Sequence, residues 1–130
     1  MTDIPEKFRD LMTKKAFANV ATVLADGSPQ VTPVWFDYTN GKLRVNTAKG
    51  RVKARTMTPG AKVAVAIMDP DNAYRYLQVR GTVARATEEG ADQHIDALSQ
   101  RYLGKAYPYR QPGDVRITVE ITPESIDTMG

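Results

Sequence analysis

The sequence predicts a mainly β domain in which six mostly antiparallel strands form a small barrel with three peripheral helices. Most segments alternate apolar and polar residues with a period of two, which is typical of strands with one buried face. Short turn signals, such as the one at residues 25–29, separate these segments. Because an open sheet would leave exposed strand edges, closure into a barrel is expected. The 130 residues fit a single domain, 1–130.

The N-terminal segment is predicted to be a helix that covers apolar surface of the domain. Pro5 suits the first turn of a helix, and Asp3 is a candidate for its cap. Residues spaced at i, i+3, i+4 and i+7 share one face, and they are Phe8, Leu11, Met12 and Lys15.

Three strands are expected next, at residues 17–24, 30–38 and 42–46, and their short turns predict a meander. Pro33 lies within the second strand, where proline cannot donate to a strand ladder, so we expect a break or bulge there. A short helix should follow over residues 50–57, because a Pro-Gly pair ends it. The basic residues of this segment also alternate with period two, so a strand remains the alternative.

The second half of the chain predicts two strands, a helix and a final strand. Residues 62–68 are a nearly continuous apolar run, expected to be buried on both faces, and residues 74–86 form a long strand with one polar and aromatic face. A helix is expected from 87–89 to Gly104. Its apolar stripe consists of Ala91, Ile95, Leu98 and Tyr102. Residues 115–121 alternate as the last strand.

Positive charge is concentrated in one part of the chain. The interval between Asp37 and Asp69 holds seven basic residues and no acid, so it carries +7, whereas the rest of the chain, with 11 basic and 15 acidic residues, carries −4. At the centre of this interval, residues 46–57, a strand is expected to give way to a helix. Arginine, lysine and a helix N-terminus all bind phosphate, so we expect an anion here.

Composition and pattern argue against several kinds of site. The chain has no cysteine, which excludes disulfides, thiolate metal sites and a cysteine nucleophile. His94, the only histidine, is expected on the surface, so neither a metal site nor a histidine-based triad is predicted. No acid–base cluster is evident, so a cofactor should supply most of the chemistry. Residues 41–62 hold no aromatic side chain for base stacking, which argues against nucleic acid as a partner.

Four parts of the sequence together resemble the pyridoxamine 5'-phosphate oxidase-like superfamily, whose fold is the FMN-binding split barrel. They are the turn and proline-bearing strand at 26–35, the pair at 46–47, the basic run at 49–55 and the apolar strand at 62–68. The chain is most similar to the branch of flavin/deazaflavin oxidoreductases that use the deazaflavin coenzyme F420, over about residues 6–125. The resemblance implies a six-stranded antiparallel split β-barrel and a homodimer with the cofactor at its interface.

The resemblance also implies which residues bind the cofactor, but it identifies no catalytic side chain and no metal ligand. Basic residues after the third strand would hold the cofactor phosphate, and these are Lys49, Arg51, Lys53 and Arg55. Residues of the second and third strands would line the ring and its sugar-like chain, and these are Thr32, Pro33, Val34, Asn46 and Thr47. Gln78, on the polar face of the long strand, would close the site from the partner subunit.

The implied activity is that of an F420-dependent reductase, which transfers a hydride between the deazaflavin C5 and a small unsaturated organic substrate. Three alternatives remain open: an FMN-binding oxidase or flavin reductase of the same fold, a non-catalytic cofactor-binding protein, and a module that binds a polyanion through the basic segment. The sequence shows no signal peptide and no apolar run of membrane-spanning length, so a cytoplasmic protein without a membrane partner is expected.

Overall fold

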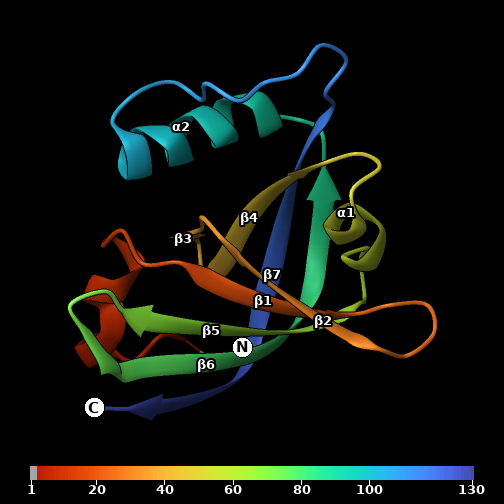
Figure 1. The fold of residues 1–130 in the computed structure, drawn as a ribbon. Helices are drawn as coiled ribbons and strands as arrows, with labels where there is room; N and C mark the ends of the chain where they lie inside the picture. The colour runs from red at the N-terminus through yellow and green to blue at the C-terminus, as the bar shows by residue number, and fades with distance from the viewer. Residues whose placement is uncertain (1–2) are drawn as a thin grey trace.

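The computed structural model describes residues 3–130, which form a seven-stranded antiparallel sheet and three helical segments (Figure 1). The strands are β1 (Ala18–Val23), β2 (Pro29–Val34), β3 (Asp37–Thr39), β4 (Lys42–Ala48), β5 (Lys62–Asp69), β6 (Asn72–Thr87) and β7 (Arg116–Met129). The helical segments are η1 (Glu6–Met12), α1 (Val52–Thr56) and α2 (Ala91–Leu103). Neighbouring strands follow the order β2-β1-β5-β6-β7-β4-β3. The predicted mainly β architecture with three helices is confirmed.

The predicted second strand, 30–38, is two strands in the structure, which is why the sheet has seven strands where six were expected. The chain leaves β2 after Val34 and enters β3 at Asp37, and these two strands occupy opposite edges of the sheet. The predicted meander is therefore wrong, because β3 and β4 form a hairpin whereas β2 pairs with β1. Pro33 does not break β2, since an edge strand tolerates a missing donor.

The break between β2 and β3, at Trp35 and Phe36, is explained by hydrogen bonds to helix α2. The Phe36 N–H donates to the Tyr102 hydroxyl at 3.4 Å, and Arg101 Nη1 donates to the Phe36 carbonyl at 2.8 Å. The Phe36 side chain is fully buried. Because α2 satisfies the backbone N–H and carbonyl of Phe36, this residue needs no neighbouring strand and the chain can cross from one sheet edge to the other.

The N-terminal helical segment covers the apolar core, as the spacing of its residues predicted. Phe8, Leu11 and Met12 are all buried in the main core cluster. The segment is a 3-10 helix, and Asp3 does not cap it. The Asp3 carboxylate instead accepts a hydrogen bond from Arg9 at 2.6 Å.

Strand β5 buries only one of its two faces, so the prediction that both are buried is wrong. Val65 and Ile67 point into the core, whereas Met68 is 47% exposed on the other face. The strand pairing places Val31 of β2 and Gln78 of β6 on this same outer face. The apolar run of β5 therefore belongs to a half-exposed strand within a partly apolar outer surface.

Helix α2 lies across the end of the sheet where β6 ends and β7 begins (Figure 1). Its predicted apolar stripe is buried, and the helix ends at Gly104, whose φ of +76° is the left-handed value favoured by glycine. The last strand is longer than predicted, because β7 continues beyond residue 121 to Met129 beside β6. Across residues 3–130, no helix is both long enough and apolar enough to span a bilayer.

Candidate functional site

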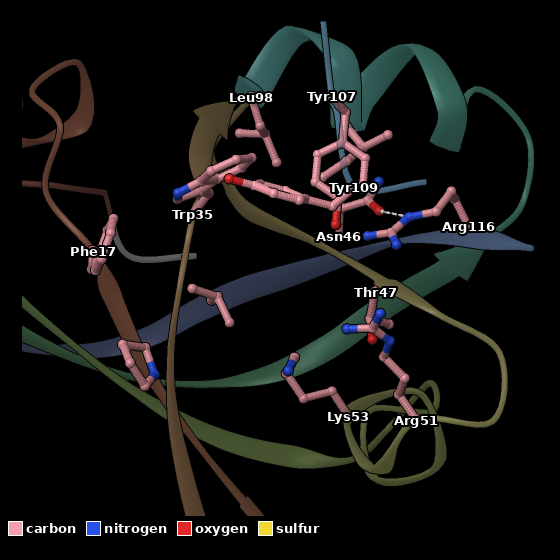
Figure 2. Close-up of a pocket in the computed structure, with 13 residues that line it drawn as sticks. Phe17, Trp35, Asn46, Thr47, Arg51, Lys53, Leu98, Tyr107, Tyr109 and Arg116 are labelled. Carbon is pink, nitrogen blue, oxygen red and sulfur yellow. Dashed lines mark hydrogen bonds between the residues drawn. The ribbon is translucent and has the colours of Figure 1, made fainter. Parts of the chain in front are cut away.

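A pocket lies where the sheet is split, between the ends of β2 and β4, the start of α1, helix α2 and the loop that leads into β7 (Figure 2). Its volume is about 270 Å³. Thr47, Arg51 and Lys53 lie on one side of the pocket, opposite Trp35 and Tyr107 (Figure 2). The pocket therefore has a polar, cationic side and an aromatic side.

Three cations line the pocket, and no acidic residue lies among its lining residues. Burial lowers the pKa of Lys53, and the nearby charges of Arg51 and Arg116 lower it further. Burial also lowers the pKa of Arg116, with a contribution from the charge of Arg51. Because an anion would relieve the repulsion among these cations, the cationic side is suited to a phosphate or a carboxylate.

Two buried polar atoms of the pocket lack a hydrogen-bond partner within residues 3–130. They are Thr47 Oγ1 and Arg116 Nη1. An unpaired polar group in a protein interior costs about 1–3 kcal/mol. A ligand that supplies oxygen atoms and a hydroxyl at this position would satisfy both groups, so the residues present fit a phosphorylated cofactor.

Arg116 is held in place by contacts on two sides. Its Nε donates to Asn46 Oδ1 at 2.9 Å (Figure 2), and its guanidinium carbon lies 5.2 Å from the centre of the Tyr107 ring. Asn46 is anchored in turn, because its amide nitrogen donates to the Ala91 carbonyl at 2.9 Å and lies 3.2 Å from His94 Nδ1. The cationic side of the pocket is thus tied to α2 through Asn46.

The opposite wall of the pocket is flat and aromatic. Trp35 stacks on Tyr102 with ring centres 5.3 Å apart and an interplanar angle of 8°. Tyr107 meets Trp35 edge to face at 6.1 Å, and Tyr109 extends the cluster toward solvent at 5.7 Å from Tyr107. Such a surface suits a planar ring. The pocket as a whole therefore matches a ligand with a planar ring at one end and an anionic group at the other.

Six of the ten predicted binding residues line this pocket, and they are Pro33, Val34, Asn46, Thr47, Arg51 and Lys53. The other four lie outside it. Lys49 forms an ion pair with Glu88 at 2.6 Å, and Arg55 donates to a backbone carbonyl of the turn before α1 at 2.8 Å. Thr32 is half-buried in β2, and Gln78 is exposed on the outer face of β6. Contact of these ten residues with a cofactor stays a prediction.

His94 is buried, so the prediction of a surface histidine is wrong. His94 is only 5% exposed, and its Nε2 lies 2.9 Å from an Asp37 carboxylate oxygen. The sequence does indicate this burial, because His94 comes three residues after Ala91 and four before Leu98. That spacing places His94 on the buried stripe of α2.

The pocket residues that were not predicted from the sequence include Tyr107, Tyr109 and Arg116. The two tyrosines stand in a loop, where spacing carries no information about what they face. Arg116 begins the final strand, and a charged residue there is expected to face solvent until the register with β4 is known. That register sets Arg116 opposite Ala48, beside the pocket.

Comparison with known proteins gives the same architecture. Residues 4–130 match the family model described as pyridoxamine 5'-phosphate oxidase. A solved structure described as an F420 reductase is 31% identical, has a TM-score of 0.82, and aligns over 95% of this chain and 98% of its own. No curated protein sequence matches the chain.

Two solved structures of lower identity share the fold. A conserved hypothetical protein from Mycobacterium tuberculosis is 20% identical with a TM-score of 0.76, over 97% of this chain and 84% of its own. The FAD and heme binding protein from Mycobacterium smegmatis is 18% identical with a TM-score of 0.72, over 98% and 71%. With the family match spanning nearly every described residue, the predicted split barrel is confirmed, and the chain belongs to the pyridoxamine 5'-phosphate oxidase family.

Proposed function

We propose that this protein is a reductase that uses the deazaflavin coenzyme F420 and transfers a hydride between its C5 and a small unsaturated organic substrate. The observation that carries the proposal is the pocket, whose lining combines three cations and no acidic residue with a cluster of aromatic rings. The 31% identity to an F420 reductase along nearly the whole chain favours the deazaflavin as the ring that binds there. The bound coenzyme would supply the hydride, and the protein would bind and orient it.

The phosphate of the coenzyme is assigned to Arg51, Lys53 and Arg116. Each arginine offers two parallel N–H groups to phosphate oxygens, and Arg116 has an Nη1 that lacks any partner in the described residues. An anion beside Lys53 would offset the burial and the neighbouring cations that lower its pKa. Thr47 Oγ1 would donate to or accept from the ribityl chain.

The ring is proposed to lie between the end of β2 and the aromatic wall. The backbone of Thr32, Pro33 and Val34 would line it, because β2 is an edge strand with backbone groups free on one side. Trp35 would lie along the ring plane. The Asn46 amide already makes three hydrogen bonds within the protein, so its main contribution is to support Arg116 at the edge of the ring site.

Two cations outside the pocket, Lys49 and Arg55, are assigned to the oligoglutamate tail of the coenzyme. Lys49 is paired with Glu88, but both side chains are more than half exposed, so this ion pair contributes little and can exchange for a tail carboxylate. The Arg55 side chain is exposed beyond the first turn of α1. Both residues therefore carry charge that an extended anionic tail can reach.

A homodimer is proposed in which a second copy covers the outer face of β1, β2, β5 and β6. Val23, Val31 and Met68 are 55%, 64% and 47% exposed on these strands. A second copy would bury this apolar surface and bring Gln78 toward the pocket of its partner. The pocket would then be completed by both subunits.

Titration of the purified protein with F420 and with FMN, followed by ligand fluorescence, tests the proposal. We expect tight F420 binding and turnover that depends on reduced F420. Arg51→Ala with Lys53→Ala should weaken F420 binding at least about tenfold, or about 1.4 kcal/mol. Lys7→Ala with Lys42→Ala removes the same charge outside the pocket and should bind like the wild type. Tight FMN binding without F420 binding would refute the coenzyme assignment, and unchanged affinity in the pocket variant would refute the phosphate roles.

FMN is the second candidate, because the three pocket cations suffice for its single phosphate and the residues assigned to a tail lie outside the pocket. Protein that is yellow as purified from a host without deazaflavin would favour FMN. Tight F420 binding without turnover of any electron-poor acceptor would instead favour a cofactor-binding protein that is not an enzyme.

A further inference from the structure

A chain of hydrogen bonds runs behind the pocket and joins α2 to three strands. It begins at Asp37 of β3, passes through His94 of α2 and Asn46 of β4, and ends at Arg116 of β7. His94 Nε2 lies 2.9 Å from Asp37 Oδ2, His94 Nδ1 lies 3.2 Å from Asn46 Nδ2, and Asn46 Oδ1 lies 2.9 Å from Arg116 Nε. His94, Asn46 and Arg116 are 5%, 8% and 5% exposed, so the chain is shielded from solvent.

The arginine at one end fixes the direction of every bond in this chain. Arg116 Nε can only donate, so the oxygen of the Asn46 amide faces Arg116 and the amide nitrogen faces His94. His94 Nδ1 must therefore accept from the Asn46 amide, and the Thr118 hydroxyl lies 2.9 Å from the same nitrogen. The ring proton of the neutral histidine then lies on Nε2, which donates to Asp37.

Asp37 is held as an ionised acceptor at the other end of the chain. Arg44 Nε and Nη2 donate to its two carboxylate oxygens at 2.7 Å and 3.0 Å. Burial alone would raise the pKa of Asp37, but hydrogen bonds from His94 and Arg44 outweigh burial and bring that pKa to about 2. A carboxylate at this position favours the His94 tautomer that keeps Nδ1 free to accept.

The other end of the chain borders the pocket, where Arg116 stands with two further cations. Repulsion between Arg116 and both Arg51 and Lys53 opposes this placement, whereas the charge of Asp114 favours it. The bond to Asn46 occupies Nε and leaves Nη1 without a partner in the described residues. The orientation of the guanidinium group therefore depends on a correctly oriented Asn46 amide.

We propose that His94 and Asp37 are positioning residues for the anion site, because they orient the Asn46 amide and that amide holds Arg116 in the geometry that receives a phosphate. Neither His94 nor Asp37 lines the pocket. The inference rests on the proposed function only in that a phosphate binds in this pocket. It does not depend on whether a flavin or a deazaflavin carries that phosphate.

Substitutions of His94 separate the two halves of the hydrogen-bond chain. In His94→Asn, the short amide keeps an acceptor near the position of Nδ1 but loses the bond to Asp37. In His94→Gln, the longer amide reaches Asp37 but leaves no acceptor for Asn46. Asp37→Asn permits the other tautomer of His94, which turns a donor toward the Asn46 amide nitrogen. Gly81→Ala is the matched control, because it lowers stability in β6 without touching the pocket or the hydrogen-bond chain.

The readout is the contribution of the phosphate to binding. It is measured as two ratios of dissociation constants. The first is the constant for riboflavin divided by that for FMN, and the second is the constant for the deazaflavin core without phosphate and tail divided by that for complete F420. Each ratio should fall at least about fivefold in His94→Gln and Asp37→Asn, and less in His94→Asn, as expected for a misplaced charged hydrogen bond. It should stay within about twofold of the wild type in Gly81→Ala, and the phosphate-free ligands should bind all variants equally.

An unchanged ratio in His94→Gln and Asp37→Asn, with a lowered Tm, would overturn the inference and leave the network as a structural tie between α2 and the sheet. A wild-type ratio near one would overturn the proposed phosphate site as well, so the two failures are distinguishable. If the variants do not fold, ¹⁵N NMR of the wild-type protein decides the question. A His94 ring protonated on Nε2 alone supports the inference, and a proton on Nδ1 overturns it.

Discussion

Replacing Arg116 with methionine should weaken ligand binding without a matching loss of stability. The arginine is buried, and burial together with the charge of Arg51 lowers its pKa, so the ligand-free protein holds this charge at a free-energy cost. Methionine has a similar length, no charge and a flexible shape that fills the same space. The substitution therefore removes the phosphate contact and the unfavourable charge together.

Two opposing effects set the expected change in stability. Loss of the donor to Asn46 Oδ1 leaves a buried oxygen unpaired, which costs about 1–3 kcal/mol. Removal of a buried charge repelled by other cations recovers an amount on the order of 1–4 kcal/mol. We expect the free energy of unfolding to change by less than about 1–2 kcal/mol.

For ligand affinity, no second effect opposes the loss of the Arg116 contact. A hydrogen bond to a charged group contributes about 1.5–3 kcal/mol, so the dissociation constant for F420 or FMN should rise about 10- to 100-fold. Urea unfolding measures the stability, and fluorescence titration measures the affinity. Arg116→Lys is the matched control, because it keeps the charge without the planar guanidinium and should recover part of the affinity. Affinity within about twofold of the wild type in Arg116→Met would refute the assigned role.

Three further predictions concern stability and optical detection. Gly81→Ala should lower the free energy of unfolding in urea by about 2 kcal/mol or more, because a Cβ there would lie 2.3 Å from the Thr122 carbonyl oxygen; wild-type stability would contradict this close approach. The folded-state pKa values of Asp37 and Asp69 are about 2, below the ordinary 3.8. The two carboxylates therefore stabilise the folded protein fully above pH 3.8, and this stabilisation should be lost as the pH falls from there toward 2. For Asp37 this contribution is on the order of 2 kcal/mol, and a urea midpoint that does not fall over this pH range would count against it. Trp35, the only tryptophan, lines the pocket, so F420 or FMN should quench its fluorescence, whereas inorganic phosphate should not; unquenched emission at saturation would place the ring elsewhere.

The alternation of apolar residues was sufficient to predict which segments are strands, but it did not predict their order. Burial of one face acts locally on each strand, so the period of two is visible in the sequence. The order depends on distant contacts. Trp35 and Phe36 continue an apolar pattern and were predicted to be strand, yet the partners of the Phe36 backbone, Tyr102 and Arg101, are 66 and 65 positions away.

The site was predictable where its residues are neighbours in the chain. Arg51 and Lys53 stand in an interval without acids, and both line the pocket. Arg116 joins them only through the pairing of β4 with β7, which no local pattern reveals. Lys49 was grouped with the pocket cations by its position in the run, but the side chain pairs with Glu88 instead. Charge in a sequence segment thus indicated where pocket cations lie better than it indicated which side chains of the run enter the pocket.

The two residues between β2 and β3 limit how far the end of one edge strand can lie from the start of the other. Trp35 and Phe36 connect strands at opposite edges of the sheet, and neither belongs to a strand ladder. Inserting one residue after Trp35 would therefore lengthen the span across the split while leaving every strand register unchanged. Because Trp35 lines the pocket and neither residue is in a strand ladder, we expect the length of this dipeptide to change the width of the pocket without altering any strand pairing.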